Sequence, residues 1–117
     1  MNQNKFDVFS TACPSHQLLD IIGNKWMILI LHKLSLKLYR FGELQREIGG
    51  ISKKVLASNL QRLEDNGLLT RHDYDEKPLK VEYSLTELGR SLSICCYAMT
   101  NWAEENIGKI EEFKSNH

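Results

Sequence analysis

A leucine repeat near the centre of this 117-residue chain constrains its fold more than any other feature. Leu56, Leu60 and Leu63 recur at intervals of four and three residues, a spacing that places them on one face of a helix. Ser52 is a favourable residue for the N-cap of that helix, and Asn66-Gly67 interrupts the pattern. The segment therefore predicts a helix from Ser52 to Asn66 whose apolar face is directed into a core.

The opposite face of this helix is polar and basic. Lys and Arg side chains contact DNA phosphates or guanine edges, and an Asn side chain can pair with adenine. The alternative is an ordinary solvated helix face. The candidate DNA-reading surface comprises Ser52, Lys53, Lys54, Ser58, Asn59 and Arg62.

Two strand-like runs follow the helix. The segments Leu68–Tyr74 and Leu79–Leu85 alternate polar and apolar side chains, as half-buried strands do, with a charged turn between them. A shorter helix over Arg40–Ile48 and the flexible turn Gly49-Gly50 come before it. Two helices followed by a ribbon predict a winged helix-turn-helix, mainly α with a small two-stranded β wing, which presents its second helix to the major groove.

The remaining segments supply the core and two outer helices. Pro14 begins a short helix, and the segment Lys25–Leu34 is apolar almost all round, as expected for a buried central helix that includes Trp26. Thr86 can cap a last long helix, whose apolar residues alternate in steps of four and three. Together these segments predict one domain over residues 1–117.

The charge of the chain is unevenly distributed, although its formal sum is zero. Residues 25–62 hold eight basic side chains and two acidic ones, a net of +6, so the ends are acidic. A basic centre can attract nucleic acid even in a neutral protein. The alternative is a solvated surface without such a partner.

Membrane and secretory functions find no support. No apolar run approaches the roughly 20 residues that span a bilayer, and the first residues lack the basic and apolar regions of a signal peptide. We therefore expect a cytoplasmic protein.

The sequence also contains no complete motif for catalysis or for metal binding. Cys13-x-x-His16 has the spacing of metal ligands, but the sequence holds no second Cys/His pair to complete a site. Neither a nucleophile elbow nor a phosphate loop is present. We expect no enzyme activity, no cofactor and no metal, and the odd number of cysteines argues against a disulfide framework.

The order of several short motifs resembles the HxlR-type winged-helix transcription regulators, which are related to the MarR group. The resemblance runs from about residue 13 to about residue 107. The motifs are Cys13-Pro14, Gly23-x-Lys25-Trp26, Arg40-Phe41-x-Glu43-Leu44, Gly50-Ile51-Ser52, Leu60-x-x-Leu63-x-x-x-Gly67-Leu68 and Pro78-x-x-Val81-Glu82-Tyr83-Ser84-Leu85-Thr86-x-x-Gly89. Lys53 departs from the glutamine that is more usual at this position, and the wing has one proline where members often have two.

The resemblance implies a homodimer formed by the N- and C-terminal helices, in which residues 87–107 are the dimerisation helix. Its partner is double-stranded DNA with a pseudo-palindromic operator, which two recognition helices read. The apolar stripe also favours pairing, because a monomer would expose it to water. The expected interface residues are Leu18, Ile22, Leu92, Cys95, Met99, Trp102 and Ile107.

Three further cations are candidates for DNA contact. The resemblance places Arg40 against the DNA backbone, and the alternative is a surface ion pair with Glu43. Lys77 and Lys80 flank the wing tip, where cations can follow a phosphate or enter the minor groove. Acidic neighbours in the same hairpin oppose that contact.

Cys13 is a candidate redox sensor. It precedes Pro14 at a predicted helix N-terminus, where the exposed amides lower the pKa of a thiol. An acidic, accessible thiol reacts with electrophiles or oxidants, and some members of the family use a cysteine here for that purpose. The alternative is a small side chain packed under the dimer interface, and Cys95 and Cys96 are expected to be packing residues.

These observations predict a sequence-specific dimeric transcription regulator that binds DNA and responds to thiol-reactive compounds. The rival is a winged-helix module for protein–protein assembly, whose basic helix faces an acidic partner. Binding to a DNA fragment that weakens steeply with salt distinguishes the first from the second.

Overall fold

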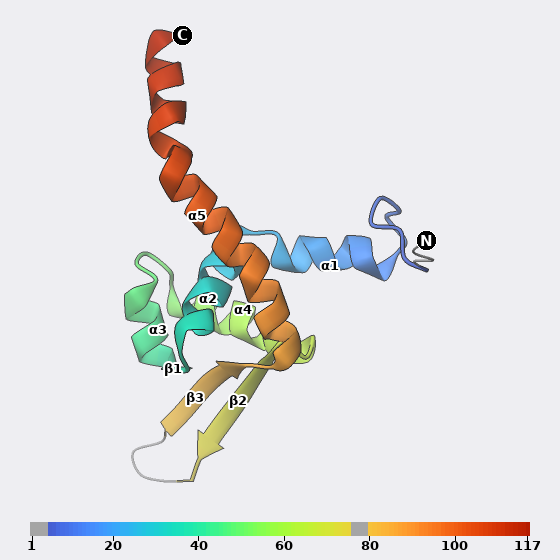
Figure 1. Cartoon of the computed structure of the whole chain (residues 1–117). Helices are drawn as coiled ribbons and strands as arrows, with labels where there is room; N and C mark the ends of the chain where they lie inside the picture. The colour runs from blue at the N-terminus through green and yellow to red at the C-terminus, as the bar shows by residue number, and fades with distance from the viewer. Residues whose placement is uncertain (1–4, 76–79) are drawn as a thin grey trace.

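The computed structural model describes residues 5–75 and 80–117. Figure 1 shows a helical body with a β-hairpin on one side and two helices that project from it. The elements are α1 (Pro14–Ile22), α2 (Lys25–Leu36), β1 (Tyr39–Arg40), α3 (Phe41–Glu47), α4 (Lys53–Asp65), β2 (Leu69–Tyr74), β3 (Lys80–Leu85) and α5 (Glu87–Asn116). The order α3–α4–β2–β3 confirms the predicted winged helix-turn-helix.

The core is built around α2. Its side chains Met27, Ile30, Leu31 and Leu34 are buried, and they meet the buried leucine face of α4. Asn24 caps α2, because its Oδ1 accepts a hydrogen bond from the N–H of Met27 at 2.9 Å. Trp26, expected in the core, is only partly buried and packs against the edge of it.

The sheet has three strands rather than the two that were expected. The order is β1-β3-β2, all antiparallel, and β1 pairs with β3 through Tyr39↔Tyr83 and Arg40↔Glu82. A two-residue strand is too short to show polar–apolar alternation, so the sequence pattern did not predict it. The expected turn between the hairpin strands falls largely in residues 76–79, outside the described residues.

The last helix is longer than predicted and leaves the body. It ends at Asn116 rather than near residue 107 and holds 30 residues, about 45 Å at 1.5 Å per residue. Only Gly89, Ser93 and Cys96 in it are buried, and α1 has no buried residue. The two helices extend in different directions (Figure 1). The Cα radius of gyration is 16.9 Å, against about 13 Å for a compact domain of this length.

The start of α5 is tied to the end of α4. The Thr86 hydroxyl donates to the carbonyl oxygen of Gly67 at 2.7 Å, and the Thr86 N–H donates to that of Leu68 at 3.1 Å. Gly67 has a φ of +73°, which permits the sharp turn that ends α4. The wing, α4 and the first turns of α5 therefore form one connected unit. None of the described helices is both long and apolar enough to span a membrane.

Candidate nucleic-acid interface

Helix α4 is held at both ends by local hydrogen bonds. Ser52 is its N-cap, and the Oγ atom accepts from the N–H of Val55 at 3.1 Å. At the other end, the N–H of Leu68 donates to the carbonyl oxygen of Leu63 at 2.9 Å. The buried leucines fix the rotation of the helix, so that its remaining face is directed into solvent.

Four polar side chains of the predicted reading surface lie on this exposed face: Lys53, Lys54, Ser58 and Arg62. Among the described residues, none of these side chains has an ion-pair or hydrogen-bond partner. They can therefore contact a polyanion without first breaking an internal interaction. Ser52 is also exposed, but its hydroxyl already serves as the helix cap.

Asn59 corrects the expected surface. It is 6% exposed, because it lies three residues after Leu56 and four before Leu63 and so faces the core. Its Nδ2 donates to the carbonyl oxygen of Val55 at 2.8 Å, while Oδ1 is buried and has no partner among the described residues. An unsatisfied buried acceptor typically costs about 1–3 kcal/mol.

A groove of about 360 Å³ runs beside the exposed face of α4. One side comes from the start of α2, and the other from α4. The lining residues are Asn24, Trp26, Lys54, Val55, Ser58, Asn59 and Arg62. Two cations, a hydroxyl, an aromatic ring and the buried amide of Asn59 therefore meet at one place.

Arg40 is exposed immediately before α3, close to Lys37 and Arg46. Its backbone N–H donates to Oε1 of Glu43 at 3.0 Å. That hydrogen bond, aided by the nearby cations of Lys37, Arg40 and Arg46, lowers the pKa of Glu43. The expected alternative, a side-chain ion pair between Arg40 and Glu43, is absent among the described residues, so the Arg40 guanidinium is available at the surface.

In the described part of the wing, charged side chains pair with one another. Lys80 Nζ lies 3.7 Å from Oε2 of Glu82 and 4.5 Å from the ring centroid of Tyr74. The Tyr74 hydroxyl donates to Oε1 of the same Glu82 at 2.7 Å. Lys80 is thus partly buried and paired with an acidic neighbour of the hairpin, as the opposing charges in the sequence suggested. Lys77, the other predicted wing contact, lies outside the described residues.

Cys13 lies at the N-terminus of α1 and is partly buried. Its Sγ is 3.2 Å from the Ser15 hydroxyl and accepts from the N–H of Asp7 at 3.3 Å. The hydrogen bond with Ser15, supported by neighbouring backbone N–H groups, lowers the pKa of the Cys13 thiol. This is the direction that the predicted helix start implied.

The other two cysteines differ from each other. Cys96 packs in the core, and burial raises the pKa of its thiol. Cys95 is exposed within the single chain rather than packed. The two positions differ in this way because consecutive residues of a helix are rotated about 100° around its axis, so that Cys96 faces the core and Cys95 faces solvent.

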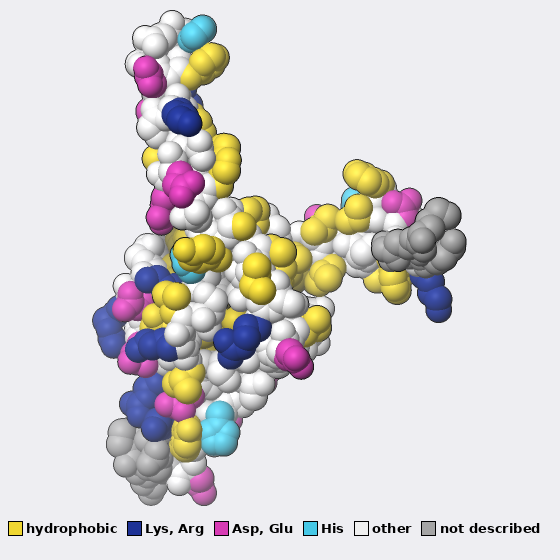
Figure 2. Space-filling view, in the orientation of Figure 1, with side chains coloured by type: hydrophobic (Ala, Val, Ile, Leu, Met, Phe, Trp, Pro, Cys, Tyr) yellow, Lys and Arg dark blue, Asp and Glu magenta, His cyan; other side chains and the backbone are white. Residues whose placement is uncertain are grey.

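The predicted dimer stripe is largely uncovered. Met99 and Trp102 are 51% and 59% exposed, and Leu18 and Ile107 are also exposed, whereas Ile22 and Leu92 pack partly against the core. Figure 2 shows apolar side chains along α1 and, at intervals, along α5. The sequence prediction missed Ile110 and Phe113, which continue the exposed stripe. Their spacing after Ile107 was the available signal. Ile94 and Tyr97, which the prediction also did not include, are exposed apolar residues of the same helix.

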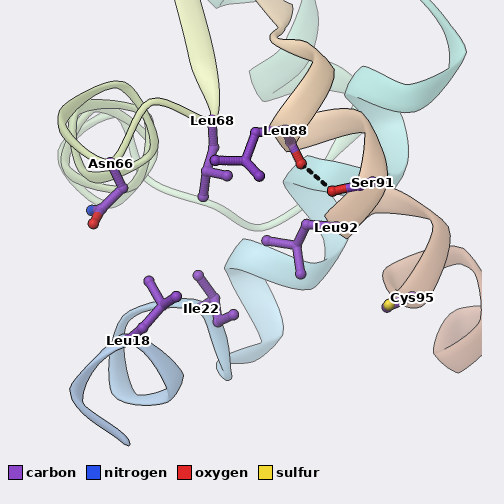
Figure 3. A pocket seen from close by; sticks show the side chains of 8 residues that line it. All are labelled: Leu18, Ile22, Asn66, Leu68, Leu88, Ser91, Leu92 and Cys95. Atoms are coloured by element: carbon purple, nitrogen blue, oxygen red, sulfur yellow. Dashed lines mark hydrogen bonds between the residues drawn. The ribbon is translucent and has the colours of Figure 1, made fainter. Parts of the chain in front are cut away.

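An apolar cavity of about 370 Å³ lies where α1, α5 and the turn after α4 meet. Figure 3 shows Leu18 and Ile22 from α1 opposite Leu88 and Leu92 from α5, with Leu68 beside Leu88. Among the described residues, no charged side chain lines this cavity, and the Ser91 hydroxyl donates to the carbonyl oxygen of Leu88 at 2.6 Å. This surface favours apolar contacts.

The helix pair α3–α4, the antiparallel wing and the exposed basic face of α4 define a winged helix-turn-helix protein. The family model "HxlR-like helix-turn-helix" matches residues 21–111, and the chain belongs to this family. The resemblance seen in the sequence motifs is thereby confirmed.

Proteins similar to this chain are named as transcriptional regulators. The chain is 41% identical over 104 residues to the uncharacterized HTH-type transcriptional regulator YtfH of Escherichia coli K12, covering 89% of this chain and 82% of YtfH. The solved ytfH structure from Salmonella typhimurium has a TM-score of 0.88 at 38% identity, covering 95% of this chain and 99% of that one. The reduced form of the redox regulator HypR has a TM-score of 0.75 at 36% identity, covering 85% and 98%. This chain is a transcriptional regulator of the helix-turn-helix type.

Proposed function

We propose that this regulator binds DNA sequence-specifically as a homodimer, with α4 in the major groove. One observation carries the proposal: Lys53, Lys54, Ser58 and Arg62 share an exposed face of α4 and have no partners among the described residues. Cations supply affinity for phosphates, and a hydroxyl or guanidinium can read base edges. The buried Asn59 is not needed for this contact.

The uncovered apolar faces of α1 and α5 support the dimer. Large exposed apolar patches on a soluble protein mark interaction sites, and the expanded shape leaves these faces without a partner in one chain. A two-fold pairing of the faces would cover Met99 and Trp102 and would set two α4 helices to read a pseudo-palindrome. Half-sites in such complexes lie about 34 Å apart.

Footprinting tests the DNA proposal. The full chain is incubated with the DNA that surrounds its own gene, in the presence of excess unrelated duplex. We expect protection of one site with two symmetric halves, and reduced protection with Arg62→Gln. If no site is protected at low salt but an acidic protein is bound, the winged helix serves protein–protein assembly and the proposal is wrong.

A thiol-based signal is a second part of the proposal, and it is favoured by one local observation. The Cys13 thiol is held by Ser15 and by the Asp7 backbone in a way that lowers its pKa. A solved relative is named a redox regulator. We infer that oxidation or alkylation of Cys13 changes DNA affinity, and that Cys13→Ser abolishes the response to diamide. An equal response of the wild type and the serine variant would contradict this.

A further inference from the structure

A second group of cations lies beside α3. Lys37 follows α2, Arg40 ends β1 and Arg46 is in the last turn of α3, and all three side chains are exposed. A hollow of about 400 Å³ is lined by Arg40, Gly42, Glu43 and Arg46. A Cβ at Gly42 would lie 3.5 Å from Nη1 of Arg46, so the Arg46 guanidinium reaches back along the helix toward its first turn. Lys37, Arg40 and Arg46 form the α3 cluster.

Nearby acidic side chains do not neutralise the α3 cluster. Oε1 of Glu43 accepts from the backbone N–H of Arg40 at 3.0 Å rather than from a guanidinium. Glu82, the partner of Arg40 in the sheet register, is engaged by the Tyr74 hydroxyl at 2.7 Å and by Lys80 Nζ at 3.7 Å. Among the described residues, no cation of the cluster has an ion-pair partner. The three cations and Glu43 therefore carry a formal charge of +2, from +3 and −1.

We propose that the α3 cluster binds the phosphate backbone of the duplex that α4 reads, and that Glu43 weakens this contact by repelling the same phosphates. When the second helix of a helix-turn-helix lies in the major groove, the first helix crosses the backbone, and here the first helix is α3. Arg46 and Lys37 thereby add to the contact expected for Arg40, and such contacts supply affinity without reading the sequence. The inference rests on the proposed function, because α4 brings the duplex to the cluster.

The charge of Glu43 persists at neutral pH. The hydrogen bond from the Arg40 N–H and the nearby cations lower the pKa of its carboxyl group. Glutamine at this position would keep a side-chain oxygen for that N–H and would lose the charge. Glu43→Gln therefore separates two roles of the residue. If Glu43 only holds the cations in place, the variant weakens DNA binding, whereas a carboxylate that repels phosphates gives an increase.

The affinity for the duplex that footprinting identifies, and for an unrelated duplex, is measured as a function of salt concentration. We expect Arg46→Gln to weaken binding about two- to fivefold and to reduce the slope of log K against log salt by about 1, as for the loss of one phosphate contact. Glu43→Gln should strengthen binding about two- to fivefold. Each variant should shift both duplexes by the same factor, because phosphates carry no sequence information.

Two substitutions on the far part of α5, which projects from the body (Figure 1), reproduce the changes of charge. Lys109→Gln matches Arg46→Gln, and Glu112→Gln matches Glu43→Gln, and both of these α5 side chains are exposed. Neither control should alter the affinity at 0.1 M salt, where charges are screened beyond about 10 Å. If Glu43→Gln does not fold, as circular dichroism would show, Arg46→Gln still decides the matter.

Comparison with Arg62→Gln keeps this inference separate from the proposed function. If Arg62→Gln lowers the salt slope but Arg46→Gln does not, or if a folded Glu43→Gln weakens binding, the inference is wrong and α4 remains the DNA-reading helix. If the two α3 variants move the affinity in opposite directions while Arg62→Gln leaves the slope unchanged, the cluster binds DNA and the assignment of α4 is wrong. Unequal effects of Arg46→Gln on the two duplexes would show base reading and would overturn the phosphate contact.

Discussion

Gly89 lies so close to the carbonyl of Leu68 that a Cβ at position 89 would come within 1.9 Å of the Leu68 oxygen. The first turn of α5 therefore touches the turn that ends α4, and only a residue without a side chain permits this contact. The Thr86 hydrogen bonds to Gly67 and Leu68 lie beside it. The start of α5 is therefore joined to the end of α4 by direct backbone contact and hydrogen bonds.

Gly89→Ala should destabilise the fold by about 1–3 kcal/mol, because the atom that must give way belongs to the backbone. Urea unfolding followed by circular dichroism measures the change. Gly49→Ala is the matched control, since a Cβ there meets nothing within 4 Å. Equal stabilities of the two variants would show that the contact is looser in solution.

Asn59→Leu should leave the free energy of unfolding unchanged or raise it by about 1 kcal/mol. The substitution removes an unsatisfied buried acceptor at the cost of one hydrogen bond to Val55. The same urea experiment measures it. A loss of more than about 2 kcal/mol would mean that Oδ1 has a partner in solution, such as an ordered water.

The alkylation rate of Cys13 should rise with pH at a lower midpoint than in the unfolded chain, because the folded environment lowers the pKa of its thiol. Iodoacetamide labelling with peptide mass spectrometry follows each cysteine separately. Cys96 should react last, since it is buried and its pKa is raised. Ser15→Ala should shift the Cys13 midpoint upward. An unchanged midpoint in this variant would show that the Ser15 contact does not set the thiol pKa.

Trp102→Glu should convert a dimer into a monomer, because it places a charge in the middle of the exposed stripe on α5. Sedimentation equilibrium at micromolar concentration measures the association. Asn101→Glu adds the same charge at the neighbouring position, where the side chain contacts Glu105 rather than the stripe, and should leave the dimer intact. A wild-type monomer under these conditions would contradict the dimer and the palindromic operator together.

Local signals explain which parts of the fold were predictable. Helix α4 was expected over 52–66 and lies at Lys53–Asp65, because its cap, its leucine face and its stop at Gly67 all act within the segment. The end of α5 was misplaced, since Gly108 is a weak helix former but is open to solvent and forces no break. Strand β1 depends on pairing with a distant strand and has no local pattern of its own.

The candidate site was predictable only in part. Lys53, Lys54, Ser58 and Arg62 are exposed as expected, whereas Asn59 is turned inward. Residue type suggested Asn59 as a DNA contact, but its spacing from Leu56 and Leu63 was the better guide to its orientation. The pairing of Lys80 with Glu82 and Tyr74 depends on side-chain contacts within the sheet, which the order of residues alone does not specify.

The salt dependence of DNA binding tests the central claim most directly. The affinity of the wild type and of Arg62→Gln for the protected duplex is measured across a range of salt concentrations. We predict that log K falls linearly with log salt, and that the slope for Arg62→Gln is smaller by about 1, as expected when one phosphate contact is lost. Lys109→Gln, far from α4, should keep the wild-type slope. A slope that Arg62→Gln leaves unchanged, or no binding of duplex at low salt, would contradict the assignment of α4 as the DNA-reading helix.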